Sequence, residues 1–260
     1  GECLMNELLK ANILKWFGKG KRYDGRALDE FRAVVIESGV TKNAEGSARV
    51  KVGDTEVIAG VKLSVEKPYP DTPKDGNLLV NVELLPLSSP DFEAGPPGEE
   101  AIEVARVVDR GLRESKAIDT RKLCLQEGEK VWAVSIDICT INSAGNLLDA
   151  SALAAVAALK NARFPAYDGK AVDYKSMTDK KLPIARFPVS VTVTRIGDFF
   201  LVDPTVEEEK VIDSRLTVAI TDGGKICAMQ KGGNSPLSIE DVSRMIDLAV
   251  SKAAELSKQL

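Results

Sequence analysis

Three arginines in one short segment are the side chains whose type and spacing best suit binding chemistry. Arg106, Arg110 and Arg113 are four and three residues apart within residues 100–119, so an α-helix would place their guanidinium groups on one face. The rigid fork of a guanidinium matches the oxygens of a phosphate group. The opposite side of this predicted helix is apolar and can pack on a core; its residues are Ala101, Val104, Ala105, Val108 and Leu112.

The same segment also permits a second interpretation, a solvated helix face covered by ion pairs. Carboxylates stand at helical spacing from every one of the three arginines, and such pairs support a helix without any ligand. The candidate pairs are Glu103–Arg106, Asp109–Arg113 and Arg110–Glu114. The residues of the helix alone leave both interpretations open.

The composition describes a chain that can bury a sizeable core and carries a mild negative charge. Its 260 residues are 44% hydrophobic, and the formal net charge at pH 7 is −4. Because the field of the whole molecule would repel a polyanion, a nucleic-acid partner requires a local basic patch. No apolar run approaches the length of a membrane span, and the first residues lack a secretory signal pattern. We therefore expect a cytoplasmic protein with no membrane partner.

The cysteines and the missing histidines exclude several kinds of catalytic and metal site. Cys3, Cys124, Cys139 and Cys227 are scattered without a Cys-x-x-Cys pair, and the chain has no histidine. The common zinc spacings and any histidine general base are therefore excluded, and reduced, buried thiols are expected. The sequence has neither the glycine-rich phosphate loop nor the dinucleotide fingerprint, so we expect no nucleotide cofactor.

Two polar segments permit ligand binding but have a simpler explanation. The acidic run at 203–209 could hold a cation, although a solvated turn after a strand is the expected structure. Residues 231–234, Lys-Gly-Gly-Asn, could form an anion nest, although the end of a hairpin is expected there. We therefore predict no metal site in this chain.

The hydrophobic pattern predicts strands followed by helices, twice along the chain. A first helix is expected at 5–18, and the helix at 148–162, apolar nearly all round, belongs inside against a sheet. A last helix should start after a capping box formed by Ser238 and Asp241. The predicted strands are 31–38, 47–52, 55–65, 78–85, 131–141, 189–195, 199–202, 216–221 and 226–231.

This order of elements predicts an α+β chain with a large and a small lobe. Residues 164–183, which contain glycine, aspartate and lysine, are the expected boundary between the lobes. The predicted units are an N-terminal helix at 1–20, a first domain at 21–165 and a second domain at 184–260.

From about residue 21 onward, the order of these pieces resembles the RNase PH family. Arg22-Tyr-Asp-Gly-Arg26 is similar to the start of that family's first domain, and Glu45-Gly-Ser-Ala48 with Gly53-Asp-Thr55 is similar to its first hairpin. Longer strings resemble one branch, the non-catalytic RNase PH-like subunits of the archaeal RNA exosome. These strings are YPDTP at 69–73, FEAGPP at 92–97, ARVVDR at 105–110 and LDASALAA at 148–155.

The sequence departs from the catalytic members of that family at two places. Where active members resemble Asp-Gly-Gly-Thr-Arg-Thr, a loop that holds inorganic phosphate, this chain has Leu147, Leu148 and Asp149 in place of the hydroxyls and the arginine. A carboxylate there would repel phosphate. Arg215 aligns with the catalytic aspartate, and Asp213 could replace that aspartate only if the register slips. The resemblance thus implies that all five are degenerate active-site positions.

The resemblance implies the RNase PH fold, a ribosomal protein S5 domain 2-like lobe plus a smaller C-terminal α+β lobe. It also implies a chain with no catalytic residue or cofactor of its own, paired with a catalytic RNase PH-like paralogue that uses inorganic phosphate. Three such pairs would form a ring with RNA-binding cap subunits and degrade single-stranded RNA from its 3′ end. Arg106 and Arg110 would contact RNA phosphates, Arg113 less so, and DNA is not expected as a partner.

Two other functions stay open at this point. One is a self-sufficient phosphorolytic 3′-exoribonuclease, which Leu147, Leu148 and Arg215 disfavour. The other is an RNA-binding module of ribosomal type that forms no ring. A phosphate-dependent assay of the chain alone tests the first, and the mass with and without a paralogous subunit tests the second.

Overall fold

A six-stranded sheet forms the large lobe of the protein, whose computed structural model describes residues 2–260. Gly1, the first residue of the predicted N-terminal unit, lies outside the described residues. The strand order is β1-β2-β3-β6-β4, with β5 paired on β6, and only the β4–β6 pair is parallel. The strands are β1 (Val34–Ser38), β2 (Gly46–Val52), β3 (Thr55–Glu66), β4 (Asn77–Glu83), β5 (Cys124–Gln126) and β6 (Lys130–Asn142).

The parallel pair explains why the arginine segment is an amphipathic helix. A chain that leaves β4 and returns as the parallel strand β6 needs a crossover, and α2 (Glu99–Glu114) supplies most of it. One face of α2 packs on β4 and on the neighbouring helix α3, which buries Val104, Val108 and Leu112. The predicted apolar stripe is therefore confirmed, and the arginine face is turned outward.

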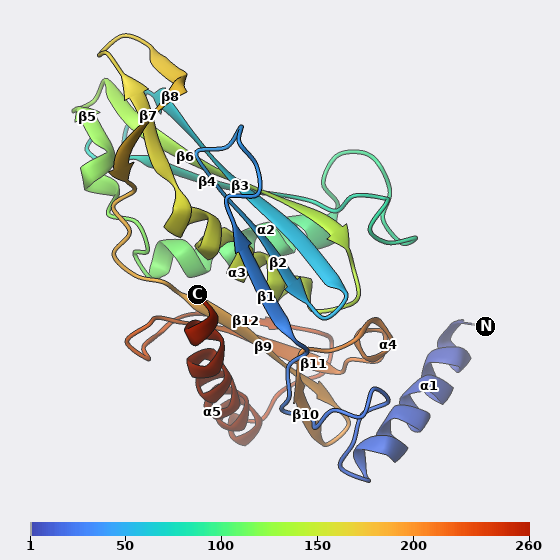
Figure 1. Cartoon of the computed structure of the whole chain (residues 1–260). Helices are drawn as coiled ribbons and strands as arrows, with labels where there is room; N and C mark the ends of the chain where they lie inside the picture. Colours follow the sequence, from blue (N-terminus) through green and yellow to red (C-terminus); the bar gives the residue numbers. More distant parts are fainter. Residues whose placement is uncertain (1) are drawn as a thin grey trace.

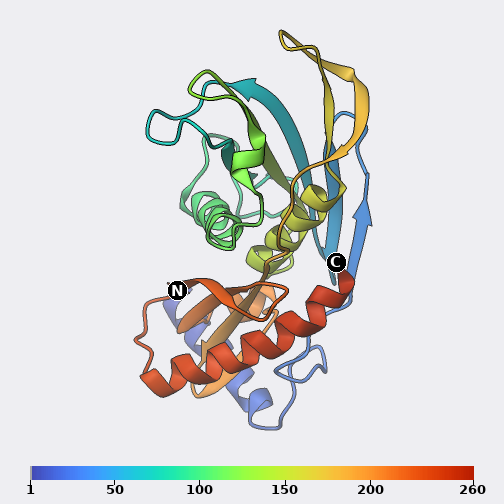
Figure 2. The same cartoon turned by 90° about the vertical axis from the view of Figure 1, so that its left-hand side faces the viewer.

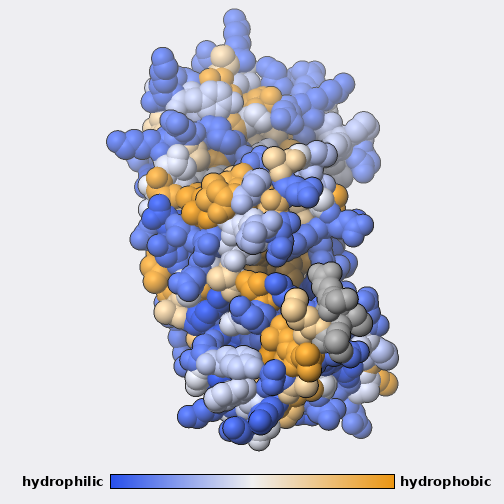
Figure 3. Space-filling model, turned by 90° about the vertical axis from the view of Figure 1, so that its right-hand side faces the viewer, coloured by the Kyte–Doolittle hydropathy of each residue, from blue (hydrophilic) through white to orange (hydrophobic). Residues whose placement is uncertain are grey.

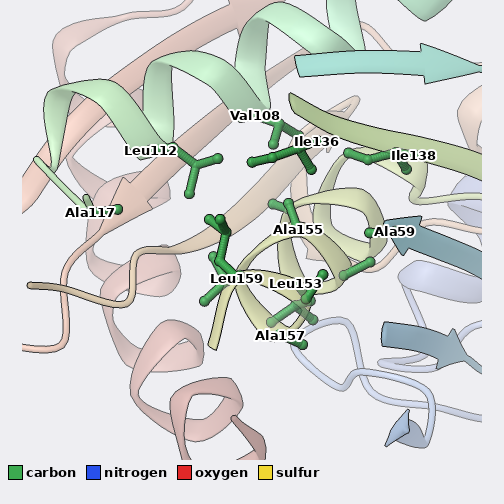
Figure 4. Close-up of a cluster of buried hydrophobic side chains, with 14 of the residues drawn as sticks. Ala59, Val108, Leu112, Ala117, Ile136, Ile138, Leu153, Ala155, Ala157 and Leu159 are labelled. Atoms are coloured by element: carbon green, nitrogen blue, oxygen red, sulfur yellow. The ribbon is translucent and has the colours of Figure 1, made fainter. Parts of the chain in front are cut away.

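Helix α3 (Leu147–Asn161) is buried against the large sheet, as its uniform apolar composition predicts, and it lies between the two lobes (Figure 1). It contacts β2 and β3 of the large sheet on one side and β9 (Val189–Ile196) of the small lobe on the other. Small residues permit the close approach, since a Cβ added to Gly46 of β2 would lie 2.4 Å from the carbonyl oxygen of Ala158. Figure 4 shows the core that results, with Ile136 of β6 beside Val108 of α2 and Ala155 of α3.

The small lobe is an antiparallel four-stranded sheet with order β10-β9-β11-β12. Its long C-terminal helix α5 (Ile239–Leu256) packs on β9 and β11 (Figure 2). The capping box of Ser238 and Asp241 at its start is confirmed. Helix α1 (Glu2–Phe17) buries Ile13 and Phe17 in a cluster with residues of the same lobe. The remaining elements are β10 (Phe199–Val202), α4 (Val206–Glu209), β11 (Ser214–Ile220) and β12 (Ile226–Gly232).

Residues 164–183, the expected boundary between the lobes, lie between the last helix of the large lobe and the first strand of the small lobe, and they contain a β-hairpin that was not predicted. Strands β7 (Arg163–Tyr167) and β8 (Val172–Lys181) pair with each other, and Trp132 packs against Phe164 and Tyr167 with ring centroids 5.3 and 5.7 Å apart. Nearly every side chain of β8 is exposed. A strand with no buried face carries no alternating pattern, so β8 was not among the predicted strands.

The arginine helix is shorter than residues 100–119 because a left-handed residue ends it. Ser115 is the C-cap and Lys116 has φ of 53°. Lys116 N–H donates to the carbonyl of Arg113, and Ala117 N–H donates to the carbonyl of Leu112. This pattern is a Schellman motif with lysine at the position where glycine is usual.

The structure also bears on the cysteines and on membrane insertion. Cys124, Cys139 and Cys227 are free thiols, as expected, but each is half-buried rather than buried. Burial raises the pKa of Cys139 and of Cys227.

Among residues 2–260, no helix is long and apolar enough to cross a membrane.

Candidate nucleic-acid interface and adjoining pocket

Arg106 and Arg110 are exposed on the outer face of α2 and are held by no carboxylate. Within the described part of the chain, neither guanidinium lies within ion-pair distance of an acidic side chain. The two residues are one helical turn apart, so their like charges repel each other. An anion bound between them would relieve this repulsion, and two neighbouring free guanidinium groups suit a phosphate group.

Arg113 differs from the other two arginines because it forms an intrahelical ion pair. Its Nη2 lies 2.7 Å from Asp109 Oδ1 and donates to the carbonyl oxygen of Leu78 at 3.0 Å. The hydrogen bond with Asp109 raises the pKa of Arg113. Of the three ion pairs that the spacing permits, the described structure contains only the one between Asp109 and Arg113. The interpretation of an ion-paired helix face therefore holds for Arg113 and not for Arg106 or Arg110.

A pocket of about 300 Å³ opens beside the N-terminal half of α2. It lies between α2, the start of α3 and the small-lobe strands β9 and β11, and it brings together Leu147, Leu148 and Arg215. Arg215 is far from the two leucines in the sequence, and all three belong to the positions at which the chain departs from the active pattern. Other lining residues are Glu100, Glu103, Val104, Asn146, Thr192, Thr194, Pro204, Glu209, Ile212 and Gly233.

The charge of this pocket does not suit a phosphate group. Three carboxyl groups line it, from Glu100, Glu103 and Glu209, whereas Arg215 is the one cation among its described lining residues. Burial of the carboxyl group raises the pKa of Glu100 and raises that of Glu209 to about 7, so Glu103 carries the firmest negative charge. Arg215 Nη2 lies 2.6 Å from Glu103 Oε2, so its charge is already paired. Leu147 and Leu148 add apolar surface where a phosphate would need hydrogen-bond donors.

Asp149 does not point at the pocket, so the expectation that its carboxylate repels phosphate there is wrong. Its side chain is fully buried and accepts hydrogen bonds from the backbone N–H and the hydroxyl of Thr192, at 3.1 and 2.8 Å. Burial raises the pKa of Asp149 to about 7, against the effect of these hydrogen bonds. Asp149 therefore joins α3 to β9, and the first turn of α3 turns it inward and Leu148 outward.

Asp213 also lies apart from the pocket. Its carboxylate accepts the backbone N–H of Gly197 at 2.7 Å and forms an ion pair of 2.5 Å with Lys10 of helix α1. Burial would raise the pKa of Asp213, but the hydrogen bond from Lys10 holds it below its usual value. Both carboxylate oxygens are thus engaged with the N-terminal helix and a turn of the small lobe.

The acidic run at 203–209 is only partly solvated, because Glu207 is exposed whereas Asp203 and Glu208 are buried. Asp203 is fully buried and accepts from Arg26, from Arg32 and from the side chain of Asn146. Burial would raise the pKa of Asp203, but the hydrogen bonds and charge of Arg32 hold it below its usual value. Among the described side chains, no group of three or more potential ligands is arranged to hold a metal ion.

This buried network shapes the loop that precedes α3. Arg32 donates to the carbonyl oxygens of Ala144 and Gly145 at 2.8 and 3.1 Å, and Asn146 adopts a left-handed conformation with φ of 61°. A Cβ at Gly145 would lie 2.3 Å from the carbonyl oxygen of Pro204. These contacts were not predicted from the sequence. The feature that could have indicated them is the presence of three arginines, Arg22, Arg26 and Arg32, within eleven residues.

The family models identify the fold that carries this pocket. The model described as "3′ exoribonuclease family, domain 1" (RNase PH) matches residues 30–165, and the domain 2 model of the same family matches residues 186–252. The chain belongs to the RNase PH family. The predicted two-lobed RNase PH fold is therefore confirmed.

Individual members of the RNase PH family are similar over nearly the whole chain. Proteins named "Exosome complex component Rrp42" from Methanothermobacter thermautotrophicus and Methanocella arvoryzae are 45% and 46% identical, covering 99% and 100% of this chain and 96% and 98% of theirs. A solved structure, "archaeoglobus fulgidus exosome with RNA bound to the active site", contains a chain with a TM-score of 0.92 and 46% identity. That match covers 98% of this chain and 99% of that one.

Proposed function

We propose that this chain is a non-catalytic subunit of an archaeal exosome ring, in which it binds RNA beside the active site of a catalytic paralogue. The observation that carries the proposal is that one pocket brings together Leu147, Leu148 and Arg215, the residues that the resemblance aligns with the phosphate loop and the catalytic aspartate. Similarity to proteins named as exosome components supports the assembly.

The chemistry of phosphorolysis explains why this chain is inactive by itself. A phosphate oxygen must attack the 3′-terminal phosphorus of the RNA, break its bond to the 3′ oxygen of the preceding nucleotide, and release a nucleoside diphosphate. Phosphate must be held in place and the leaving oxygen must receive a proton. The pocket offers three carboxyl groups and two leucines for the first task, and Asp213 lies elsewhere, engaged by Lys10.

The contribution of this chain is then the row of arginines on α2. Contacts to phosphate carry no sequence information, which suits a complex that degrades general single-stranded RNA. Arg106 and Arg110 have the exposed, unpaired guanidinium groups that such contacts need, whereas Arg113 is engaged by Asp109. Inorganic phosphate is used by the partner subunit, and this chain needs no cofactor of its own. The RNA-binding cap subunits and the cytoplasm remain the expected partners and compartment.

An activity assay on three samples tests this proposal. The chain, its catalytic paralogue and their mixture are each incubated with single-stranded RNA and inorganic phosphate, and the released nucleoside diphosphates are measured. We expect release from the mixture and none from this chain alone. Release by the partner-free chain that disappears in Asp213→Asn would instead establish a self-sufficient enzyme.

A further inference from the structure

Arg106 has an acidic neighbour on each side along α2. Glu103 is three residues before it and Asp109 is three residues after it, so both stand on its face of the helix. A pair at this spacing forms readily on an isolated helix and neutralises the arginine. An unpaired Arg106 on α2 therefore needs a reason why neither carboxylate turns toward it.

Both carboxylates are held by other arginines. Asp109 is bound by Arg113 within the helix. Glu103 is bound by Arg215, which is 112 residues away in the sequence and lies on strand β11 of the small lobe, with Nη2 at 2.6 Å from Oε2. The pair is half-buried, with side-chain exposures of 24% for Arg215 and 34% for Glu103. Burial of this degree strengthens the pair relative to a fully solvated one.

The sheet leaves space for the guanidinium at this position. Arg215 on β11 is paired in register with Gly232 on β12. A Cβ added to Gly232 would lie 2.7 Å from Arg215 Cζ and 2.9 Å from its Nε. The missing side chain of Gly232 thus lets the arginine lie across β12 and reach α2.

We propose that Arg215 is a positioning residue, which holds Glu103 away from Arg106 and so keeps the Arg106 guanidinium free for an RNA phosphate. The inference rests on the proposed function, because it assumes that Arg106 contacts RNA. Arg215, which aligns with the catalytic aspartate of active members, would then contribute to RNA binding indirectly, through Glu103. Without Arg215, the carboxylate of Glu103 is released beside Arg106 and offsets its charge.

The test measures RNA affinity of the complete complex of this chain with its catalytic paralogue, without inorganic phosphate so that the RNA is not consumed. We expect Arg215→Ala to weaken binding about three- to fivefold at low salt, the effect of one additional nearby negative charge, and less at high salt. The double variant Arg215→Ala/Glu103→Gln should return to within about twofold of the parent affinity, because no charge is released. Arg215→Lys should retain most of the parent affinity for RNA, because a lysine can still pair with Glu103.

Two further variants separate positioning from a structural role. Gly232→Ala should displace the guanidinium of Arg215 and weaken binding as Arg215→Ala does. Arg195→Ala is the matched control, since Arg195 forms an ion pair of 2.9 Å with Asp241 and has a similar exposure of 20%, but it lies on β9 and holds no residue of α2. It should leave RNA affinity unchanged.

The outcomes distinguish this inference from the proposed function. If Arg106→Glu weakens binding but Arg215→Ala does not, or if Glu103→Gln fails to rescue Arg215→Ala, the positioning role is wrong and the RNA-binding role of α2 stands. If Arg106→Glu has no effect, the positioning role is overturned, and if reversal of both Arg106 and Arg110 has none, the RNA-binding role of α2 is overturned as well. Rescue by Glu103→Gln together with an unaffected Arg195→Ala supports positioning, because a merely structural loss would not be repaired by removing a second charge.

Discussion

Arg106 and Arg113 are two turns apart on α2 and have different surroundings. Arg113 is paired with Asp109 and with a backbone carbonyl, whereas Arg106 is exposed and has no acidic partner among the described residues. Both residues are arginines, so the difference between them comes from the carboxylate of Asp109, which pairs with Arg113 and leaves Arg106 free to bind a ligand. Arg110 is likewise exposed and has no acidic partner among the described residues, although it lies against β11 and β12 of the small lobe.

Reversal of charge at Arg106 or Arg110 tests the binding face directly. One charge-assisted contact to a phosphate contributes on the order of 1.5–3 kcal/mol, so Arg106→Glu or Arg110→Glu should weaken RNA binding by the complex roughly ten- to a hundredfold. Each should cost more than the alanine variant, because reversal adds repulsion. The loss should be similar for different RNA sequences and should shrink as the salt concentration rises.

Melting of the same complexes provides the control for this prediction. If the face were only ion-paired, the variants would lower the melting temperature by the small amount typical of surface pairs and leave RNA turnover unchanged. Arg113→Ala should show that behaviour, since Arg113 is the paired member. Unaltered degradation at low salt with both Arg106 and Arg110 reversed would contradict an RNA-binding role.

At the scale of elements, the start of α3 is joined to the small lobe by buried polar groups. Asp149 accepts two hydrogen bonds from Thr192 on β9, and the Thr192 hydroxyl lies 2.8 Å from that of Thr217 on β11. All three side chains are buried. Because a buried polar group without a partner is costly, this chain of contacts constrains how the two lobes pack.

The raised pKa of Asp149 predicts a dependence of stability on pH. Burial raises this pKa to about 7 from 3.8, so between these values the folded state binds more protons than the unfolded one. Stability therefore falls as the pH rises through this window. We expect the melting temperature to fall from about pH 5 to about pH 8, and to fall less in Asp149→Asn, whose amide cannot ionise.

A surface variant gives the comparison for the pH experiment. Asp222 is exposed in the turn between β11 and β12, so Asp222→Asn makes the same chemical change without altering a buried group. It should retain the pH dependence of the parent protein. An equal fall in melting temperature for Asp149→Asn and the parent would show that Asp149 is not the group responsible.

At the scale of the whole molecule, the surface retains features that suit assembly. The edge strand β12 carries Ile226 and Met229, which are 41% and 46% exposed, and Leu87 in the loop before α2 is 72% exposed. Figure 3 shows one face of the molecule, where apolar atoms lie in separate patches among polar ones. An uncovered strand edge with apolar side chains is a common site of pairing with another chain.

Native mass measurement tests assembly at this scale. Mixed with its catalytic paralogue, the chain should give a heterohexamer. Pairing with a second chain would cover an exposed strand edge, and a closed ring leaves no subunit surface without its partner. The chain alone should not reach that mass. A stable complex of the single chain with RNA, formed without any partner, would instead favour an RNA-binding module of ribosomal type.

The predictions from sequence were most accurate where local pattern and burial coincide. The strands of alternating burial, the apolar helix α3 and the cap of α5 lie within a few residues of their predicted positions. They failed at the β7–β8 hairpin, whose second strand has almost no buried side chain and so no alternation to detect. The end of α2 was also misplaced, because a lysine adopts the left-handed conformation for which glycine is the usual signal.

By itself, the sequence determined that three arginines share a helix face, that no histidine chemistry is available, and that the chain resembles the RNase PH family. The tertiary structure decided which arginines are free, because Glu103, three residues before Arg106, is bound by Arg215, which is 112 positions from Glu103 in the sequence. It also decided that Asp149 faces inward. Helical periodicity reports which side chains are neighbours on one element, whereas ion pairs and burial between elements depend on how the two lobes pack, which no local pattern records.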